Sequence, residues 1–342
     1  MNYQDVQEVF DNAGINYEIP DDIIYSMSVT NEQLVQLTSH ISYLSMPTNI
    51  GFIRFFDGAG KDCVYLIDSG NDETTGARIL DFIKANFPDA TIKAIINTHS
   101  HADHCGGNSY LVRETGCEVW ASKGEAYLME FPDIETQLVW GGTAIHDIRS
   151  KYLLAEACQV QRVFDGEEEI SLSCENGEIR LKVISLPGHY VDQVGFLLTD
   201  TDGKRVMFAG DVLSGRNSIK KHWIQYLLDE TKTKESLFKI QTVEADFYIP
   251  GHGDIVDNIE GIAELNLLAI LETEDMIVDE LRSPKSSEEL LKAVADRSGI
   301  TLKTSQFCLI GSTLRSYLTG LYESGRIEHT MEANRMLWRK IS

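Results

Sequence analysis

Short apolar runs alternate with polar segments along most of the chain, and this pattern predicts a protein that mixes strands and helices. A hairpin is expected first, with strands at 50–56 and 63–68 around the turn Asp57-Gly58. A helix is expected over 75–87 because polar and apolar residues there recur at helical spacing. Later apolar runs are short enough to be buried strands, and they fall at 92–97, 181–184, 205–207 and 246–248.

The first 45 residues differ from the rest because they are acidic and contain no Lys or Arg. Thr30-Asn31-Glu32-Gln33 resembles a capping box ahead of apolar residues, which predicts a short helix there. The apolar positions of this helix would be Leu34, Val35, Leu37 and Ile41. We interpret residues 1–45 as an N-terminal extension that covers the fold.

The last part of the chain predicts a separate small unit. A helix is expected over 255–281, and Ser283-Pro284-Lys285 ends it. Ser286-Ser287-Glu288-Glu289 is a second capping box that opens another helix, which ends near Gly299. Apolar residues from Phe307 to Leu321 then recur at helical spacing, and 327–341 has strand-like pieces. At 342 residues a large domain and a smaller one are expected, which we place at 46–265 and 266–342.

Polar residues of metal-binding type follow the run 92–97. Within six residues, three imidazoles and one carboxylate occur, from His99, His101, Asp103 and His104. His99 and His101 alternate on an extended backbone, so both can point to the same side. Divalent metals of intermediate softness favour nitrogen and carboxylate donors of this kind. The segment therefore predicts half of a metal site at the end of a buried strand.

Three later fragments each place one further donor after a strand. They are Pro187-Gly188-His189, Ala209-Gly210-Asp211 and Pro250-Gly251-His252. Sites collect at the carboxyl ends of strands in layered α/β proteins. A Pro-Gly pair before a histidine sharpens the turn and removes bulk near the metal. Four such fragments in this order are a far more specific signal than any one of them.

The four fragments together resemble the metallo-beta-lactamase-fold hydrolases, whose HxHxDH motif is matched at 99–104. The resemblance covers residues 45 to 265 and is nearer to glyoxalase II and the beta-lactamase-like endoribonucleases than to antibiotic-resistance enzymes. It implies an α/β fold, a four-layer αββα sandwich. It also implies that the C-terminal helices and hairpin form a small helical, winged-helix-like domain, used for packing or dimerisation.

The resemblance further implies a two-metal centre. The first metal would be held by His99, His101 and His189, and the second by Asp103, His104 and His252. Asp211 would bridge the two metals, and Asp103 would orient the nucleophile, so Asp103 and Asp211 are the candidate catalytic residues. A water held between the metals would have a pKa near neutrality, which makes hydroxide available. Zinc is the expected metal, and iron or manganese accept the same donors. Cys105 receives no ligand role and is interpreted as a small buried thiol.

Composition and charge limit the classes of function that the chain can have. The six cysteines have no paired spacing, no apolar run approaches a membrane span, and the N-terminus has no signal-peptide pattern. A cytoplasmic enzyme without membrane association is therefore expected, with a homodimer as one option for its assembly. The net charge is −23, and residues 281–342 contribute +4, so the first 280 residues carry −27. Such an acidic body disfavours non-specific binding of nucleic acid.

The favoured function is hydrolysis of a small-molecule ester, thioester or lactone. A metal-dependent endoribonuclease or phosphodiesterase is the alternative, because the seven donors alone do not select a substrate. Arg216, Lys220, Lys221 and Trp223 follow Asp211 on an expected loop that could reach an anionic substrate, and they are equally compatible with an exposed surface. Two hypotheses from different classes are an iron-dependent redox enzyme on the same fold and a binding protein that kept its metal without turnover.

The long interval between His104 and His189 predicts an inserted helical segment that leans over the site. It contains Trp120, Phe131 and Trp140, for which core packing is the simpler interpretation. Four histidines match no donor position and are interpreted as surface residues or ordinary polar contacts: His40, His146, His222 and His329.

Overall fold

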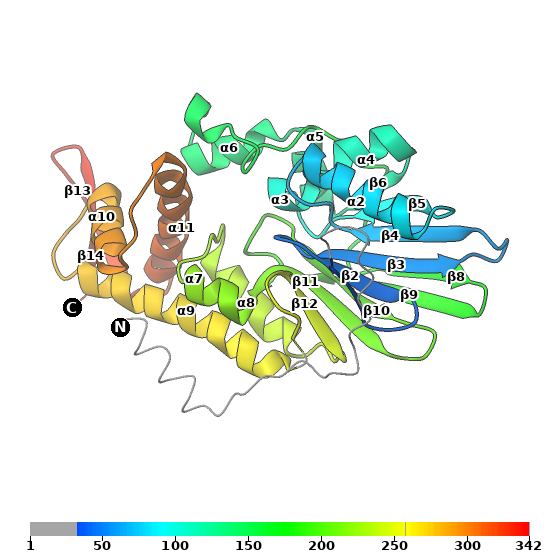
Figure 1. Cartoon of the computed structure of the whole chain (residues 1–342). Helices are drawn as coiled ribbons and strands as arrows, with labels where there is room; N and C mark the ends of the chain where they lie inside the picture. The colour runs from blue at the N-terminus through cyan, green and yellow to red at the C-terminus, as the bar shows by residue number, and fades with distance from the viewer. Residues whose placement is uncertain (1–32, 257, 342) are drawn as a thin grey trace.

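Two β-sheets face each other and carry helices on their outer sides (Figure 1). The computed structural model describes residues 33–256 and 258–341. The four layers are helices, a seven-stranded sheet, a five-stranded sheet and helices again. The α/β sandwich expected from the sequence is confirmed.

The seven-stranded sheet follows the order of the chain. Its strands are β1 (Gln33–Gln36), β2 (Ile41–Ser45), β3 (Ile50–Phe56), β4 (Asp62–Ile67), β5 (Thr91–Ile96), β6 (Glu118–Ala121) and β7 (Arg162–Val163). β1 to β4 are antiparallel, and β4 to β7 are parallel. The parallel half needs helical crossovers, which α2 (Glu73–Asn86) and α4 (Asn108–Thr115) supply.

The five-stranded sheet has the order β12-β11-β10-β9-β8. Its strands are β8 (Glu169–Cys174), β9 (Gly177–Ser185), β10 (Val194–Thr199), β11 (Arg205–Ser214) and β12 (Phe247–His252). Only β11 and β12 are parallel, and α8 (Glu230–Ile240) lies between them in the chain. The register of β11 and β12 shifts on both sides of Gly210, which has a φ of 57°. This bulge re-aims the residue that follows, Asp211.

The two-residue period of the strands decides which layer each side chain joins. Phe52 packs under the helices outside the first sheet, whereas its neighbour Ile53 packs between the sheets. Phe196 likewise lies between the sheets, and Leu197 lies on the opposite face against the outer helices. At Gly51 an added Cβ would lie 2.6 Å from the ring of Phe208 on the facing sheet, so close packing of the sheets requires glycine there.

The C-terminal elements extend the molecule beyond the sandwich (Figure 1). They are α9 (Ile259–Glu280), α10 (Ser287–Arg297), α11 (Thr304–Glu323) and the hairpin of β13 (Ile327–Glu332) and β14 (Arg335–Lys340). The capping box predicted at Ser286 and Glu289 is confirmed. The expected division at residue 265 falls inside α9. None of the described helices combines the length and the apolar composition that a bilayer crossing requires.

The helix predicted around Leu34 to Ile41 is wrong. Its described part forms β1 and β2, the two strands at one edge of the first sheet. Of the capping box expected at 30–33, residues 30–32 lie outside the described residues and Gln33 begins β1. The backbone N–H groups of Leu37 and Thr38 donate to the Ile41 carbonyl and close the turn between the strands. Apolar residues on both sides of a tight turn imitate helical spacing. The expected boundary at residue 45 therefore falls between β2 and β3 of one sheet.

Part of the interval between His104 and His189 is a helical insertion, as predicted. It includes α5 (Lys123–Glu130), α6 (Asp133–Trp140) and the 3-10 helix η1 (His146–Ile148). Val139 of α6 and Leu153 form an apolar cluster with Cys308 and Leu309 of α11. The insertion is thus packed against the C-terminal elements. Trp120 is buried, but Phe131 and Trp140 are exposed, so core packing is wrong for these two.

Candidate metal centre

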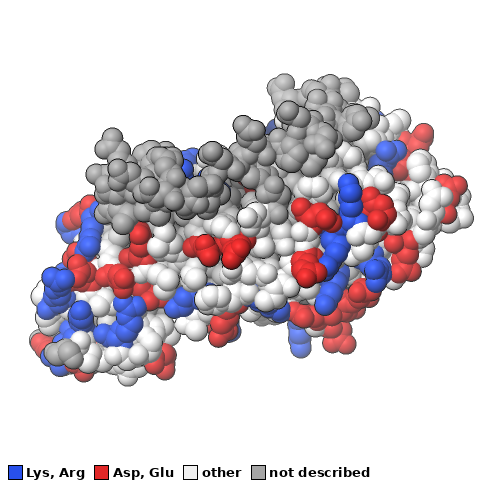
Figure 2. Space-filling view, turned by 90° about the horizontal axis from the view of Figure 1, so that it is seen from below, with Lys and Arg blue, Asp and Glu red and all other residues white. Residues whose placement is uncertain are grey.

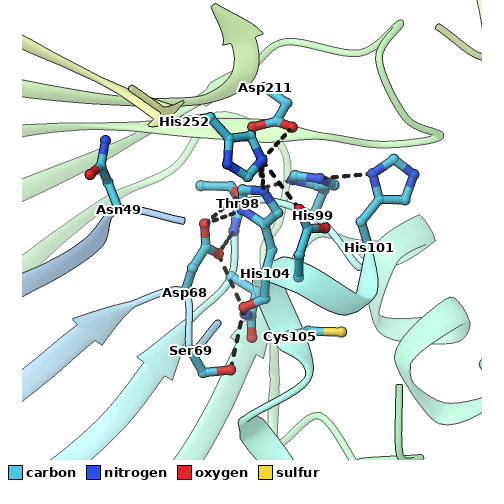
Figure 3. Close-up of polar contacts among 12 residues, drawn as sticks. Asn49, Asp68, Ser69, Thr98, His99, His101, His104, Cys105, Asp211 and His252 are labelled. Atoms are coloured by element: carbon cyan, nitrogen blue, oxygen red, sulfur yellow. Dashed lines mark hydrogen bonds and ion pairs between the residues drawn. The ribbon is translucent and has the colours of Figure 1, made fainter. Parts of the chain in front are cut away.

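The seven predicted donor side chains converge at one edge of the sandwich, although they come from four separate parts of the chain. His99 and His101 follow β5, and Asp103 and His104 lie on the short helix α3 (Ala102–Cys105). His189 lies in the connection from β9 to β10, Asp211 on β11 and His252 at the end of β12. Figure 3 shows how the imidazoles of the motif point toward Asp211 and His252. Asp211 lies inside its strand, which extends to Ser214, beyond the end of the apolar run seen in the sequence.

The first group of donors consists of His99, His101 and His189. Nδ1 of His101 lies 3.1 Å from Nε2 of His99 and 3.0 Å from Nε2 of His189. All three donor atoms lie within 4.8 Å of one another, as a shared metal ion requires. The ring of Tyr190 packs against the His101 ring at a centroid distance of 4.0 Å.

The second group consists of Asp103, His104 and His252. Nε2 of His252 lies 3.2 Å from Oδ2 of Asp103 and 3.4 Å from Nε2 of His104. Asp211 lies between the two groups. Its Oδ1 is 3.3 Å from Nε2 of His104, and its Oδ2 is 3.3 Å from His252 and 3.6 Å from His189.

These separations fit metal ions. Ligand atoms at about 2.0–2.1 Å from a tetrahedral zinc ion lie about 3.3 Å from one another, which matches the donor distances in both groups. Oδ1 of Asp211 is buried and accepts no hydrogen bond of good geometry from a described residue, although Nε2 of His104 lies 3.3 Å away. A buried carboxylate oxygen without a partner is costly unless a cation satisfies it. The residues present therefore fit a pair of divalent metals with Asp211 in the shared position.

Burial keeps the first group of histidines neutral. The pKa values of His99 and His101 lie well below the usual range, because both rings are buried and stand close to other imidazoles. Burial also lowers the pKa of His189. Neutral imidazole is the form that coordinates metals, so these three side chains are prepared to bind without losing a proton.

The second group behaves differently because carboxylates surround it. Burial alone would lower the pKa of His104, but Asp211, Asp68 and Asp103 raise it to about 10. Asp211 and Asp103 likewise raise the pKa of His252 to about 12 against the effect of burial. In return the two histidines lower the pKa values of Asp103 and Asp211, although burial opposes this. Without metal, these imidazoles hold protons that metal binding would displace.

Asp68, which the sequence analysis did not select, orients His104. Its Oδ2 accepts a hydrogen bond from Nδ1 of His104 at 2.8 Å, and Oδ1 accepts one from the backbone N–H of Thr98 at 2.8 Å (Figure 3). This contact leaves Nε2 of His104 to face Asp211. A carboxylate that holds the far nitrogen of a metal-binding histidine is the usual supporting arrangement. Asp68 has a positive φ of 62°, and its signal in the sequence was only its place at the end of an apolar strand.

Backbone carbonyl groups orient two other histidines. Nδ1 of His189 donates to the carbonyl of Tyr226 at 3.0 Å, and Nδ1 of His252 donates to that of Pro47 at 2.7 Å. Both contacts leave Nε2 for the metal centre. A carbonyl group is offered by every residue type, so nothing in the sequence marks Tyr226 or Pro47 for this role.

The loop that carries His252 is held by Asn49. Its backbone N–H donates to the Gly251 carbonyl at 2.8 Å, and its amide donates to Pro250 and Gly253. A Cβ on Gly251 would lie 1.9 Å from Oδ1 of Asp211. Glycine at position 251 therefore leaves room for the Asp211 carboxylate, as expected for the Pro-Gly pair before His252. At Gly188 the reason differs, because φ is 126° and a Cβ would meet the backbone of Thr233 instead.

Glu125 on α5 connects the two loops of the first group. Its carboxylate accepts from the backbone N–H and hydroxyl of Ser100, and from the backbone N–H of Asp192 at 2.7 Å. Ser100 stands between His99 and His101, and burial raises the pKa of Glu125 to about 7. The residue is an intramolecular support that the sequence analysis missed.

A cavity of about 430 Å³ opens beside the centre. It is lined by donors of both groups, by α6 and Tyr152 of the insertion, and by α11. Ser218 on α7 (Arg216–Lys221) and His222 after it also line the cavity. The loop expected after Asp211 is therefore partly a helix. His222 is exposed, as expected for a surface residue, and it also borders the cavity. Cys105 is buried and its thiol donates to the Ser100 carbonyl, as expected for a structural thiol.

Two of the histidines without a donor position make ordinary contacts. His40 pairs with Asp200 at 2.6 Å, and His329 packs against Tyr322 and Trp338. The six cysteines are free and buried.

A family model described as the metallo-beta-lactamase superfamily matches residues 45–252. The chain belongs to this superfamily. The match begins at the end of β2 and ends at His252, so it contains all seven converging side chains. The C-terminal elements from α9 onward lie outside it.

Relatives with assigned names match parts of the chain. An "Atrochrysone carboxyl ACP thioesterase" of Aspergillus fumigatus is 26% identical over 195 residues, which are 57% of this chain and 49% of that protein. "Hydroxyacylglutathione hydrolase GloC" of Haemophilus influenzae is 28% identical over 151 residues, 43% of this chain and 63% of that protein. The chain thus spans about half the length of the thioesterase it matches.

Solved structures of the superfamily share the fold over more of the chain. A beta-lactamase domain protein from Burkholderia ambifaria has a TM-score of 0.69 at 14% identity and covers 90% of this chain and 95% of its own. A metallo-beta-lactamase family protein from Thermus thermophilus has a TM-score of 0.65 at 20% identity and covers 86% of this chain and 94% of its own. At these identities the likeness concerns the fold alone.

Proposed function

We propose that this chain is a two-metal hydrolase that cleaves an ester, thioester or lactone. The observation that carries the proposal is the convergence of two donor groups on Asp211, whose buried Oδ1 accepts no hydrogen bond of good geometry from a described residue. One metal would be held by His99, His101 and His189, the other by Asp103, His104 and His252, and both by Asp211. Zinc fits the donor set, and iron or manganese would accept it. When bound, the metals supply a water of lowered pKa and polarise the substrate carbonyl.

The side chains of the protein would contribute orientation and proton handling. Asp103 is partly exposed, with 37% of its side chain accessible, and it lines the cavity. From this position its carboxylate can accept a hydrogen bond from the attacking water and hold it toward the carbonyl carbon. Asp68 and the carbonyls of Tyr226 and Pro47 keep the imidazoles oriented during the reaction. Apolar side chains of Val139, Leu309 and Ile310 exclude water from another part of the wall.

The charge of the site supports a carbonyl substrate rather than RNA. Among the described residues that line the cavity there is no Lys or Arg, whereas Asp103, Glu135 and Asp211 are acidic. A nuclease needs cations beside its metals, because contacts to phosphate dominate its affinity. Figure 2 shows basic and acidic groups interspersed over one face of the molecule. Two of the named relatives, a thioesterase and a hydroxyacylglutathione hydrolase, support the same substrate class.

We further propose that α10, α11 and the hairpin form a winged-helix-like unit that serves packing or dimerisation. The support is the order of these elements and the pairing of Lys285 with Trp338, which adds a bridge before α10 to the hairpin. We also propose a cytoplasmic location. The free, buried cysteines support it, because thiols stay reduced in that compartment.

A substrate panel tests the proposed function. The metal-loaded protein is offered acyl thioesters, esters, lactones, a generic phosphodiester and single-stranded RNA, with the His101→Ala variant as the control. Hydrolysis of at least one carbonyl class that is lost in His101→Ala is expected. Salt-sensitive RNA cleavage that is lost in His101→Ala, with no carbonyl substrate cleaved, would replace the proposal with a nuclease.

A further inference from the structure

One carboxyl group in the cavity has no assigned role. Glu135 lies in the first turn of α6, is only 6% exposed, and lines the cavity together with His101 and Asp103. No hydrogen bond or ion pair joins its carboxyl group to any described residue. Buried polar side chains are normally hydrogen-bonded, so an unpartnered one that faces a cavity points to a missing ligand.

The usual structural role of a glutamate at this helix position is not available to Glu135. Glutamate at the third position of a helix commonly accepts from the backbone N–H of the N-cap residue. Here the N-cap is Pro132, which has no N–H group. Glu135 therefore cannot close the capping box, and its carboxyl group is left free to meet a ligand.

The surroundings of Glu135 favour the protonated, uncharged form of its carboxyl group. Val139, one turn further along α6, and Leu153 and Leu309 make this part of the cavity wall apolar. Burial raises the pKa of Glu135 well above its ordinary value, and the nearby carboxylate of Asp103 adds to this effect. A protonated carboxyl group offers one hydrogen-bond donor and one acceptor.

We propose that Glu135 is a specificity residue that hydrogen-bonds an uncharged polar group, a hydroxyl or an amide, on the substrate. This assignment rests on the proposed function, because the substrate whose polar group contacts Glu135 would have its reacting carbonyl at the metal centre. A hydroxyl or amide matches both the donor and the acceptor of a neutral carboxyl group. A carboxylate or phosphate placed against Glu135 would meet an acidic side chain and, among the described lining residues, no Lys or Arg that could pair with it. The part of the cavity at Glu135 therefore favours an uncharged polar group over an anionic one.

A matched substrate series tests this assignment. Thioesters of equal length carry an amide, a hydroxyl, a methylene or a carboxylate at the same position, placed first on the acyl side and then on the thiol side. With the wild-type protein, kcat/KM for the amide or hydroxyl member on one side is expected to exceed the methylene member at least about tenfold, with the carboxylate member poorest. Comparison of the amide member with the hydroxyl member shows which of the two groups forms the hydrogen bond with Glu135.

Two variants separate the chemistry of Glu135 from its bulk. Glu135→Gln keeps an uncharged donor and acceptor, so it should retain the preference for the polar member. Glu135→Leu removes both in an apolar setting, so the polar and methylene members should be cleaved at equal rates. Asp133→Leu is the control, because Asp133 lies on the same helix but is exposed and paired with Arg149. This control should retain the full preference.

The outcomes distinguish the assignment from the proposed function. A preference that survives in Glu135→Leu would overturn the assignment. So would a loss in Glu135→Gln as complete as in Glu135→Leu, because the charged form would then be the active one. Equal hydrolysis of all four members by the wild-type protein overturns the assignment alone. Absence of hydrolysis of every thioester by protein with two bound metals overturns the proposed function for thioesters and the assignment with it.

Discussion

The carboxylate of Asp68 lies 2.8 Å from Nδ1 of His104, the ring nitrogen opposite the one that faces Asp211. Both side chains are buried, and they follow two adjacent parallel strands, β4 and β5. The contact fixes which nitrogen of His104 carries a proton and which one is turned to the donor group. The orientation of His104 therefore depends on a residue that is not one of the seven donors.

Asp68→Asn should weaken binding of the second metal by about 10–100-fold, because the neutral amide holds the imidazole less strongly. Asparagine tolerates the positive φ at this position, so the fold should persist. Metal titration of the purified variant measures the effect, with thermal unfolding as the check on the fold. Unchanged affinity for both metals would show that Asp68 stabilises the loop after β4 and has no effect on metal binding.

Gly251→Ala should displace the Asp211 carboxylate, since the new Cβ would lie 1.9 Å from its Oδ1. A shift of about 1 Å in a catalytic group can reduce the rate about 100-fold, so activity and metal content should both fall. Gly142→Ala is the matched control, because a Cβ there meets nothing within 4 Å. Full activity in Gly251→Ala would mean that Asp211 does not occupy the bridging position.

The pH dependence of stability should differ between the metal-free and the metal-bound protein. In the metal-free protein the pKa values of His104 and His252 are raised to about 10 and about 12. Groups with raised pKa values stabilise the fold fully below their unfolded value of about 6.5, and this stability is lost as the pH rises. Each histidine can contribute at most about 1.4 kcal/mol per pH unit above that value.

The free energy of unfolding of the metal-free protein should therefore decrease between about pH 7 and about pH 9. With metal bound it should not decrease, because metal binding needs the deprotonated imidazoles and strengthens with pH. Denaturant titrations with and without metal at several pH values measure both curves. A rise in stability of the metal-free protein over this range would contradict the protonated pair.

Asp211→Ala should abolish hydrolysis while the chain still folds, and His101→Ala should do the same. The donors lie at the edge of a large apolar sandwich, so metal binding is not needed to form the core. Residual activity above about 10% in Asp211→Ala would argue against the bridge, because tenfold is only about 1.4 kcal/mol of barrier. Circular dichroism and thermal unfolding verify that both variants fold.

The convergence of the seven donor side chains could be predicted because each comes after an apolar run in a characteristic local pattern. Their supports could not, because the contacts are made in three dimensions. His189 and His252 use the carbonyls of Tyr226 and Pro47, which any residue could offer. Glu125 contacts loops that are 25 and 67 residues away in the chain. Ligand roles for the seven donors stay a prediction that metal analysis can test.

The fold was predictable where a segment had one clear period, as at β3, β4 and α2. It was not predictable at β1 and β2, because two short strands around a tight turn place apolar residues three and four positions apart. Leu34 packs beneath the outer helices, whereas Leu37 and Ile41 pack between the sheets. The side chains on one face of a helix could not pack in both of these layers. Only the three-dimensional structure shows that these residues pack in two different layers.

Metal content per chain tests the central claim most directly. Elemental analysis of wild-type protein purified without added metal, together with Asp211→Ala prepared in parallel, measures it. The two donor groups predict about two metal equivalents for the wild-type protein and a clear loss in the variant. One equivalent at full occupancy, with Asp211 or His252 uncoordinated in a crystal structure of the metal-bound protein, would contradict the two-metal centre.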